Sequence, residues 1–137
     1  TDISATAQTA YLLQKMEEYD GITILATNLM QNFDDAYKRR MKFIIRFSFP
    51  QEGQRRELWQ KVFPRQMPLD GDIDIDFLAG NFELSGASIK NIAVNAAFIA
   101  ASRREITGMG HIMEALQQEY EKSGKILGKA ELKEYYI

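Results

Sequence analysis

The hydrophobic pattern of this chain changes at Pro50, and that change limits the fold more than any other feature. Before Pro50, short apolar runs follow a single helical stretch. After it, apolar residues recur at helical spacing throughout. We therefore predict two structural regions, residues 1–50 and 51–125, followed by a tail over residues 126–137.

The first region predicts part of an α/β sheet. Residues 4–19 have helical spacing, residues 22–26 form a short apolar run typical of a buried strand, and residues 43–49 are rich in β-branched and aromatic side chains. Asp34 or Asp35 is a candidate N-cap for a short helix between the strands. Because two strands alone are marginal in water, we expect them to be the end of a larger sheet.

The second region predicts a small bundle of four amphipathic helices. We expect helices over residues 51–63, 73–80 and 110–122, and a longer one that begins after Ser85 as its N-cap. Trp59 is expected in the core. The apolar positions of the longer helix repeat at i, i+3, i+4 and i+7, and they are Ile89, Ile92, Ala93, Ala96, Ala97 and Ala100.

Composition excludes several classes of function. The net charge of −2 gives no reason to expect nucleic acid or a membrane surface as partner. The chain has no cysteine and a single histidine, His111, so we expect no metal site of its own; His111 is expected at the surface or as a helix cap. No apolar run is long enough to span a bilayer and no secretion signal is evident, which predicts a cytoplasmic protein.

Three side chains in the first region are candidate catalytic groups. Asn28 lies at the carboxyl end of the first predicted strand, where ligands bind in open α/β sheets. An amide there can orient water or a phosphate oxygen, and the guanidinium groups of Arg39 and Arg40 can neutralise charge on a transferred phosphoryl group. The alternative is that Asn28 merely turns the chain and the arginines form a solvated basic patch.

Five short motifs, in order, resemble the second half of an AAA-type ATPase over most of the chain. They are Leu12-Leu-Gln-Lys-Met16 followed by Gly21, Ala26-Thr-Asn28, Phe33-Asp-Asp-Ala36 followed by Arg39-Arg40, Phe47-Ser-Phe-Pro50 followed by Arg55 or Arg56, and Leu84-Ser-Gly-Ala87. The resemblance implies the end of the αβα sheet of a P-loop NTPase, with two strands, followed by an all-α four-helix lid.

The resemblance also implies roles for individual residues. Asn28 would be sensor 1, which contacts the attacking water or the γ-phosphate. Arg39 and Arg40 would supply the arginine finger that reaches the nucleotide of the next protomer. The sequence Arg39-Arg40-Met-Lys departs from the usual spacing of two fingers, so which arginine acts stays open.

A nucleotide contact is implied at the start of the longest helix. Gly86 and Ala87 would let the backbone approach adenine or ribose, and the alternative is a tight helix start. Lys90 is the nearest cation, and its spacing also fits a side chain that faces solvent. The implied cofactors are ATP or ADP with Mg²⁺, whose ligands are expected upstream.

The motifs that hold phosphate and magnesium are missing. The chain has no G-x-x-x-x-G-K followed by Ser or Thr, and no apolar strand that ends in Asp-Glu. We therefore expect this chain alone to be inactive, and the parent to be an ATPase that forms a ring, most simply a hexamer, and remodels a protein or an assembly. The alternative is a non-catalytic helical protein-interaction module that binds no nucleotide.

Overall fold

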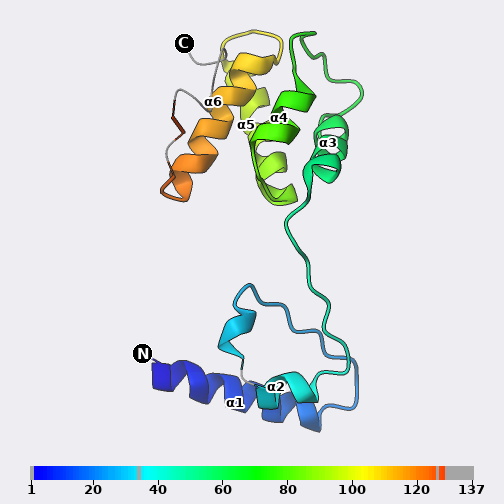
Figure 1. The fold of residues 1–137 in the computed structure, drawn as a ribbon, viewed down its shortest axis with the longest axis vertical. Helices are drawn as coiled ribbons and strands as arrows, with labels where there is room; N and C mark the ends of the chain where they lie inside the picture. The colour runs from blue at the N-terminus through cyan, green and yellow to red at the C-terminus, as the bar shows by residue number, and fades with distance from the viewer. Residues whose placement is uncertain (1, 34, 126, 129–137) are drawn as a thin grey trace. The chain divides into compact units, whose positions relative to one another are not determined.

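The computed structural model describes residues 2–33, 35–125 and 127–128, and the chain divides into two compact units (Figure 1). Unit 1 is Thr1–Arg46 and unit 2 is Phe47–Ile137. Each unit is described by itself. In the described parts of both, every regular element is a helix.

Unit 1 contains α1 (Asp2–Glu18), the 3₁₀ turn η1 (Met30–Asn32) and α2 (Asp35–Arg40). The helix predicted near residues 4–19 is confirmed. The candidate cap Asp34 lies outside the described residues. Leu13 is buried with 2% of its surface exposed, whereas most apolar side chains of this unit are open to solvent.

The predicted α/β fold is wrong for the residues that the structure describes. Residues 22–27 and 43–50 have no regular secondary structure and form no sheet. Ile22, Ile24 and Phe43 are 90%, 87% and 85% exposed. A helix pairs its own backbone groups, but a strand needs a neighbouring strand to accept and donate its hydrogen bonds. The described chain supplies no such neighbour, so the β-type composition of these segments produces no sheet.

Unit 2 contains the four helices predicted after Pro50, at bounds close to those expected. They are α3 (Glu52–Lys61), α4 (Ile75–Asn81), α5 (Gly86–Ser102) and α6 (Met109–Lys122). Helix α5 packs against α6, and α3 packs against α4 and α5 (Figure 1).

The core of unit 2 is apolar and continuous across the four helices. Trp59 is 1% exposed, as predicted, and the inward stripe of α5 begins at Ile89, which is also 1% exposed. Ser85 is the N-cap of α5, as predicted, because its Oγ accepts a hydrogen bond from the amide of Ser88 at 3.1 Å. The other large and fully buried side chains are Leu78, Phe82, Ile92, Met109, Ile112 and Leu116.

A loop far from α6 in sequence caps the start of that helix. Asp72 Oδ1 accepts a hydrogen bond from the Met109 amide at 3.0 Å, and next to it the Asp70 amide donates to the Thr107 carbonyl at 2.9 Å. The negative carboxylate also matches the positive end of the helix dipole. The start of α6 is therefore fixed by residues that precede α4.

His111 caps the same helix, but it is not a surface residue. It is buried, its Nδ1 accepts a hydrogen bond from the Gly108 amide at 3.0 Å, and its Nε2 lies 2.7 Å from Glu105 Oε2. Because Nδ1 accepts a hydrogen bond, the proton of a neutral ring is on Nε2 and is donated to the carboxylate. The predicted capping role is confirmed, and the surface alternative is wrong.

Candidate functional site

The six candidate site residues are divided between the two units. Asn28, Arg39 and Arg40 belong to unit 1, and Gly86, Ala87 and Lys90 belong to unit 2. Their surroundings within each unit determine which groups are available to a ligand.

Asn28 lies in a bend between residues 22–27, which have no regular secondary structure, and the 3₁₀ turn η1. Its side chain is exposed. The turn is held locally by a hydrogen bond from the Leu29 amide to Thr27 Oγ1 at 3.0 Å. Thr27 therefore makes the local turn contact, and the Asn28 amide is left at the surface.

The two arginines of α2 have different surroundings. Arg40 Nε lies 2.9 Å from Glu17 Oε1, which ties the end of α2 to α1. Arg39 is exposed, and no ion pair of its guanidinium is found among the described residues. Both arginines lie in the last turn of α2, where a cation also interacts favourably with the helix dipole.

The start of α5 has two small residues, the partly buried Gly86 and the exposed Ala87, and free backbone donors. The Ser88 amide donates to Ser85 Oγ and the Ile89 amide to the Ser85 carbonyl, so the helix leaves the Gly86 and Ala87 amides without an intrahelical acceptor. A Cβ at Gly86 would meet only the Leu58 side chain, at the ordinary contact distance of 3.8 Å. Packing within the unit therefore does not require glycine at this position.

Lys90 lies one turn further along α5 and is exposed. No hydrogen bond or ion pair of its side chain is found in the part of the chain that the structure describes. It is a solvent-facing cation on the same helix as the two free amides.

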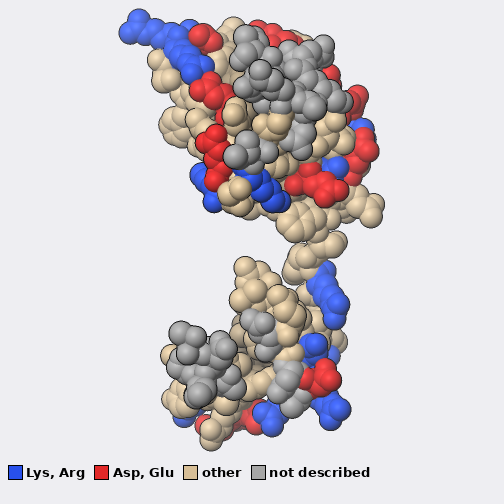
Figure 2. All heavy atoms as spheres, turned by 60° about the vertical axis from the view of Figure 1, so that its left-hand side comes forward, with Lys and Arg blue, Asp and Glu red and all other residues tan. Residues whose placement is uncertain are grey.

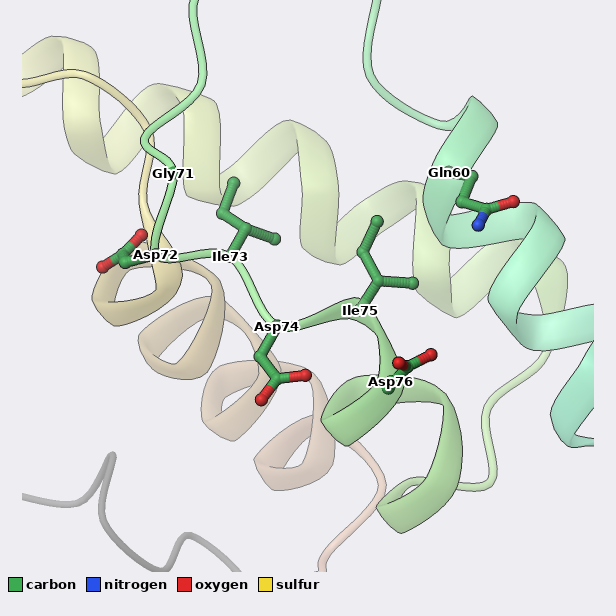
Figure 3. A pocket seen from close by; sticks show the side chains of 7 residues that line it. All are labelled: Gln60, Gly71, Asp72, Ile73, Asp74, Ile75 and Asp76. Carbon is green, nitrogen blue, oxygen red and sulfur yellow. The ribbon is translucent and has the colours of Figure 1, made fainter.

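A shallow hollow lies at the start of α4, between Gln60 of α3 and residues 71–76 (Figure 3). Its carboxylates already have structural tasks. Asp72 caps α6, Asp74 accepts from the Phe77 amide at the start of α4, and Asp76 pairs with Arg56 at 2.7 Å. None of the candidate site residues lines it, so the hollow is not the predicted site.

Other sites are absent from the described part of the chain. No group of three or more acidic, histidine or cysteine side chains is placed to hold a metal ion there. Within the same residues, no helix combines the length and the apolar character needed to cross a bilayer. Figure 2 shows acidic and basic side chains interspersed on the drawn face of unit 2, not a surface of one sign.

Sequence comparison places the chain among known ATPases. The proteasome-activating nucleotidase of Sulfurisphaera tokodaii is 31% identical over 125 residues, which cover 83% of this chain and 32% of that protein. The ATP-dependent zinc metalloprotease FtsH of Pelodictyon phaeoclathratiforme is 35% identical over 69% of this chain. A katanin p60 ATPase-containing protein from Papio anubis is 36% identical over 65% of it. This chain belongs to the AAA ATPase family.

The match covers most of this chain and a small part of each relative. The chain spans about a third of the nucleotidase, 16% of the FtsH protein and 18% of the katanin protein. No family model matches it. The AAA resemblance stated from the motifs is thus confirmed at the level of the family.

Sequence reasoning missed the contacts that join distant segments of this AAA chain. The sequence predicted a cap at Ser85, because cap and helix are adjacent, but nothing in it indicated that Asp72 would cap a helix 37 residues later. Arg55 was noted only as part of a motif, although it is 7% exposed and bonds to Ala79, 24 residues away. Arg56, the next residue on the same helix, is only partly exposed, and two adjacent arginines leave no periodic signal that tells the buried one apart.

Proposed function

We propose that this chain is the C-terminal part of an AAA ATPase module, in which it supplies sensor 1, an arginine finger and the helical lid. The observation that carries the proposal is the alignment of 83% of the chain with about a third of a nucleotidase. The four-helix unit 2 fits the lid, and the order of the five motifs supports the roles of the individual residues.

Asn28 and one arginine of α2 would act on the γ-phosphate. Arg39 is the better finger, because its exposed guanidinium has no ion pair among the described residues, whereas Arg40 already pairs with Glu17 at 2.9 Å. A finger stabilises charge in the transition state and is worth on the order of 10³-fold or more in turnover. Arg40 would then position the end of α2 against α1.

Gly86 and Ala87 would contact the nucleotide through the start of α5. Two free amides and two small residues at a partly exposed helix start fit a flat base or a ribose, and Lys90 can approach a phosphate from the next turn. AAA ATPases use nucleotide with Mg²⁺. The described residues supply no metal site, so the magnesium ligands would come from another part of the protein.

The parent protein would couple ATP hydrolysis to remodelling of a protein or an assembly. Three relatives have names that include a nucleotidase, a katanin ATPase and an ATP-dependent protease. A finger that reaches a neighbour's nucleotide requires a ring, for which we propose a hexamer. This chain alone would be inactive, because it lacks the phosphate-binding loop.

The first test is the coding sequence upstream of Thr1. We expect a glycine-rich G-x-x-x-x-G-K loop ending in Ser or Thr, and an apolar strand ending in Asp-Glu, within about one domain length. A start codon close to Thr1 with neither motif would contradict the proposal. It would favour the non-catalytic interaction module instead.

The second test uses substitutions in the complete protein. Arg39→Ala should lower ATP turnover by about 10³-fold while nucleotide binding stays nearly unchanged. Asn28→Ala should slow hydrolysis without loss of helical content. Lys42→Ala is the matched control, because Lys42 is an exposed cation a few residues away. Equal turnover of the Arg39 and Lys42 variants would remove the finger assignment.

A further inference from the structure

Arg55 is a buried cation whose hydrogen bonds all go to backbone carbonyls in the contacts that the structure describes. It lies in the first turns of α3 and is only 7% exposed. Its Nε donates to the Ala79 carbonyl at 2.8 Å, and its Nη1 donates to the Pro50 carbonyl at 2.8 Å. One planar guanidinium therefore joins Pro50, which precedes the N-cap of α3, to the last turn of α4.

The peptide group between Pro50 and Gln51 is held on both sides. Its carbonyl accepts from Arg55 Nη1, and its N–H, on Gln51, donates to Gln54 Oε1 at 2.9 Å. The ring of Pro50 restricts φ at that residue. The plane of this peptide, which sets the direction of the chain as it reaches α3, is thus fixed by two side chains of α3.

The Ala79 carbonyl is a favourable acceptor for a cation. Ala79 is among the last four residues of α4, whose carbonyls have no intrahelical donor, and the negative end of the helix dipole lies there. A charged donor at such a carbonyl is stronger than a neutral one. Arg55 thereby connects the lead-in segment, residues 47–50, to a second helix as well as to its own.

Arg56, the next residue, has a different role. It is partly exposed and pairs with Asp76 at 2.7 Å and with Glu52 at 3.3 Å. The hydrogen bond and charge of Asp76 raise the pKa of Arg56 above its ordinary value. Arg55 therefore binds backbone carbonyls, whereas Arg56 pairs with carboxylates. A substitution of Arg56 is a matched control for a substitution of Arg55.

We propose that Arg55 is a positioning residue that locks the lead-in segment to α3 and α4, so that residues 47–50 and the helices of unit 2 move as one body. A motion of the chain before Phe47 would then be passed to the helices and not absorbed within the lead-in segment. The inference rests on contacts inside unit 2 and does not depend on the proposed ATPase function.

Spin labels on the full 137-residue chain test this directly. The chain has no cysteine, so single cysteines at the exposed positions Ser48 and Asn91 can carry the labels. In the otherwise unchanged chain, we expect one narrow distribution of distances between the label on the lead-in segment and the label on α5. Arg55→Met should broaden it, Arg55→Lys should broaden it less, and Arg56→Gln should leave it unchanged.

Hydrogen exchange at the Gln51 amide gives a second readout. Loss of a charged hydrogen bond to the same peptide group should speed exchange of this amide by about tenfold in Arg55→Met. Amides of α5 and α6 should keep their protection when the measurement is made well below the unfolding temperature. Arg55→Lys keeps the charge and one donor direction. Its exchange rate at the Gln51 amide should lie between those of the unchanged chain and Arg55→Met.

Two results would overturn the proposal. One is a distance distribution that is already broad in the unchanged chain. The other is an Arg55→Met or Arg55→Lys variant that loses thermal stability and protection evenly over all four helices, while its distance distribution below the unfolding temperature stays narrow. That second outcome would make Arg55 a packing residue only.

Discussion

Units 1 and 2 have similar kinds of apolar residues, but unit 2 buries them and unit 1 leaves most of them exposed. In unit 2, Trp59 and Ile112 are 1% and 0% exposed in a core shared by four helices. In unit 1, Leu13 is buried, but Ile24 and Phe43 are 87% and 85% exposed. Helices that satisfy their own backbone can combine into a core from a short stretch of chain, whereas extended segments need partners before they bury anything.

Removal of the largest buried side chain in unit 2 should have the strongest effect on folding. Trp59→Ala should lower the free energy of unfolding by about 3–5 kcal/mol, because it leaves a cavity between α3 and the core. Denaturant titration followed by circular dichroism measures it. Phe98→Ala, at a side chain 69% exposed on α5, is the control and should change stability by less than about 0.5 kcal/mol. If both variants lost the same unfolding free energy, Trp59 would not be buried in a packed core.

The cap of α5 should matter less than the core, but measurably. Ser85→Ala removes the acceptor for the Ser88 amide and should cost about 1 kcal/mol of unfolding free energy. Ser85→Asp, which restores an acceptor, should recover most of the loss. If Ser85→Asp were as unstable as Ser85→Ala, the loss of stability would not come from the missing cap.

A surface ion pair between Arg103, the C-cap of α5, and Glu114 of α6 should contribute less than the Ser85 cap. Arg103 Nη1 lies 2.9 Å from Glu114 Oε2, and the hydrogen bond and charge of Glu114 raise the pKa of Arg103. A raised pKa in the folded state gives stability that is complete below the ordinary pKa of arginine and is lost only as pH rises through the higher folded value. The small loss in Arg103→Gln should therefore be the same at neutral and at mildly alkaline pH.

Arg104→Gln is the control for that variant, because Arg104 is the neighbouring exposed arginine. Both variants can be compared by thermal unfolding at low and high salt. The difference between Arg103→Gln and the unchanged chain should shrink as salt screens the pair. If the stability difference between Arg103→Gln and the unchanged chain grew from neutral to mildly alkaline pH, it would contradict the pH dependence expected from the raised pKa of Arg103.

Polar substitution in unit 1 should leave folding stability almost unchanged and alter association instead. Phe43→Ser with Ile45→Ser removes apolar side chains that are 85% and 76% exposed, so little buried area is lost. Exposed apolar segments favour self-association, and light scattering at increasing concentration should show less of it in the variant. Phe98→Ser in unit 2 is the control for an isolated apolar residue. Unfolding of the chain by the double substitution would show that these residues are packed.

The sequence predicted the part of the fold that depends on nearby residues. Apolar spacing located α3 to α6, and the Ser85 cap followed from its position before Gly86. Residues 43–49 have the composition of a strand, but strand formation depends on a partner that local sequence does not contain. The same limit explains why the Asp72 and Arg55 contacts were missed, since both join segments far apart along the chain.

The candidate site was predicted only as a set of residues. Asn28 and Arg39 were chosen for their chemistry and motif order, and those roles stay predictions. What the structure adds is a difference that the sequence did not contain, namely that Arg40 is paired with Glu17 and Arg39 has no such pair among the described residues. Side-chain pairing between two helices depends on their packing, which no single motif encodes.

The bond between Asp72 and the Met109 amide closes a loop of chain that includes all of α4 and α5. Closing such a loop costs chain entropy, and this free energy must be supplied when the two ends meet. Helices α5 and α6 adjoin in sequence and can pair early in folding, whereas the cap on α6 requires that the segment before α4 has already docked. Formation of this bond should therefore be a late folding event, and its rupture should be an early step in unfolding.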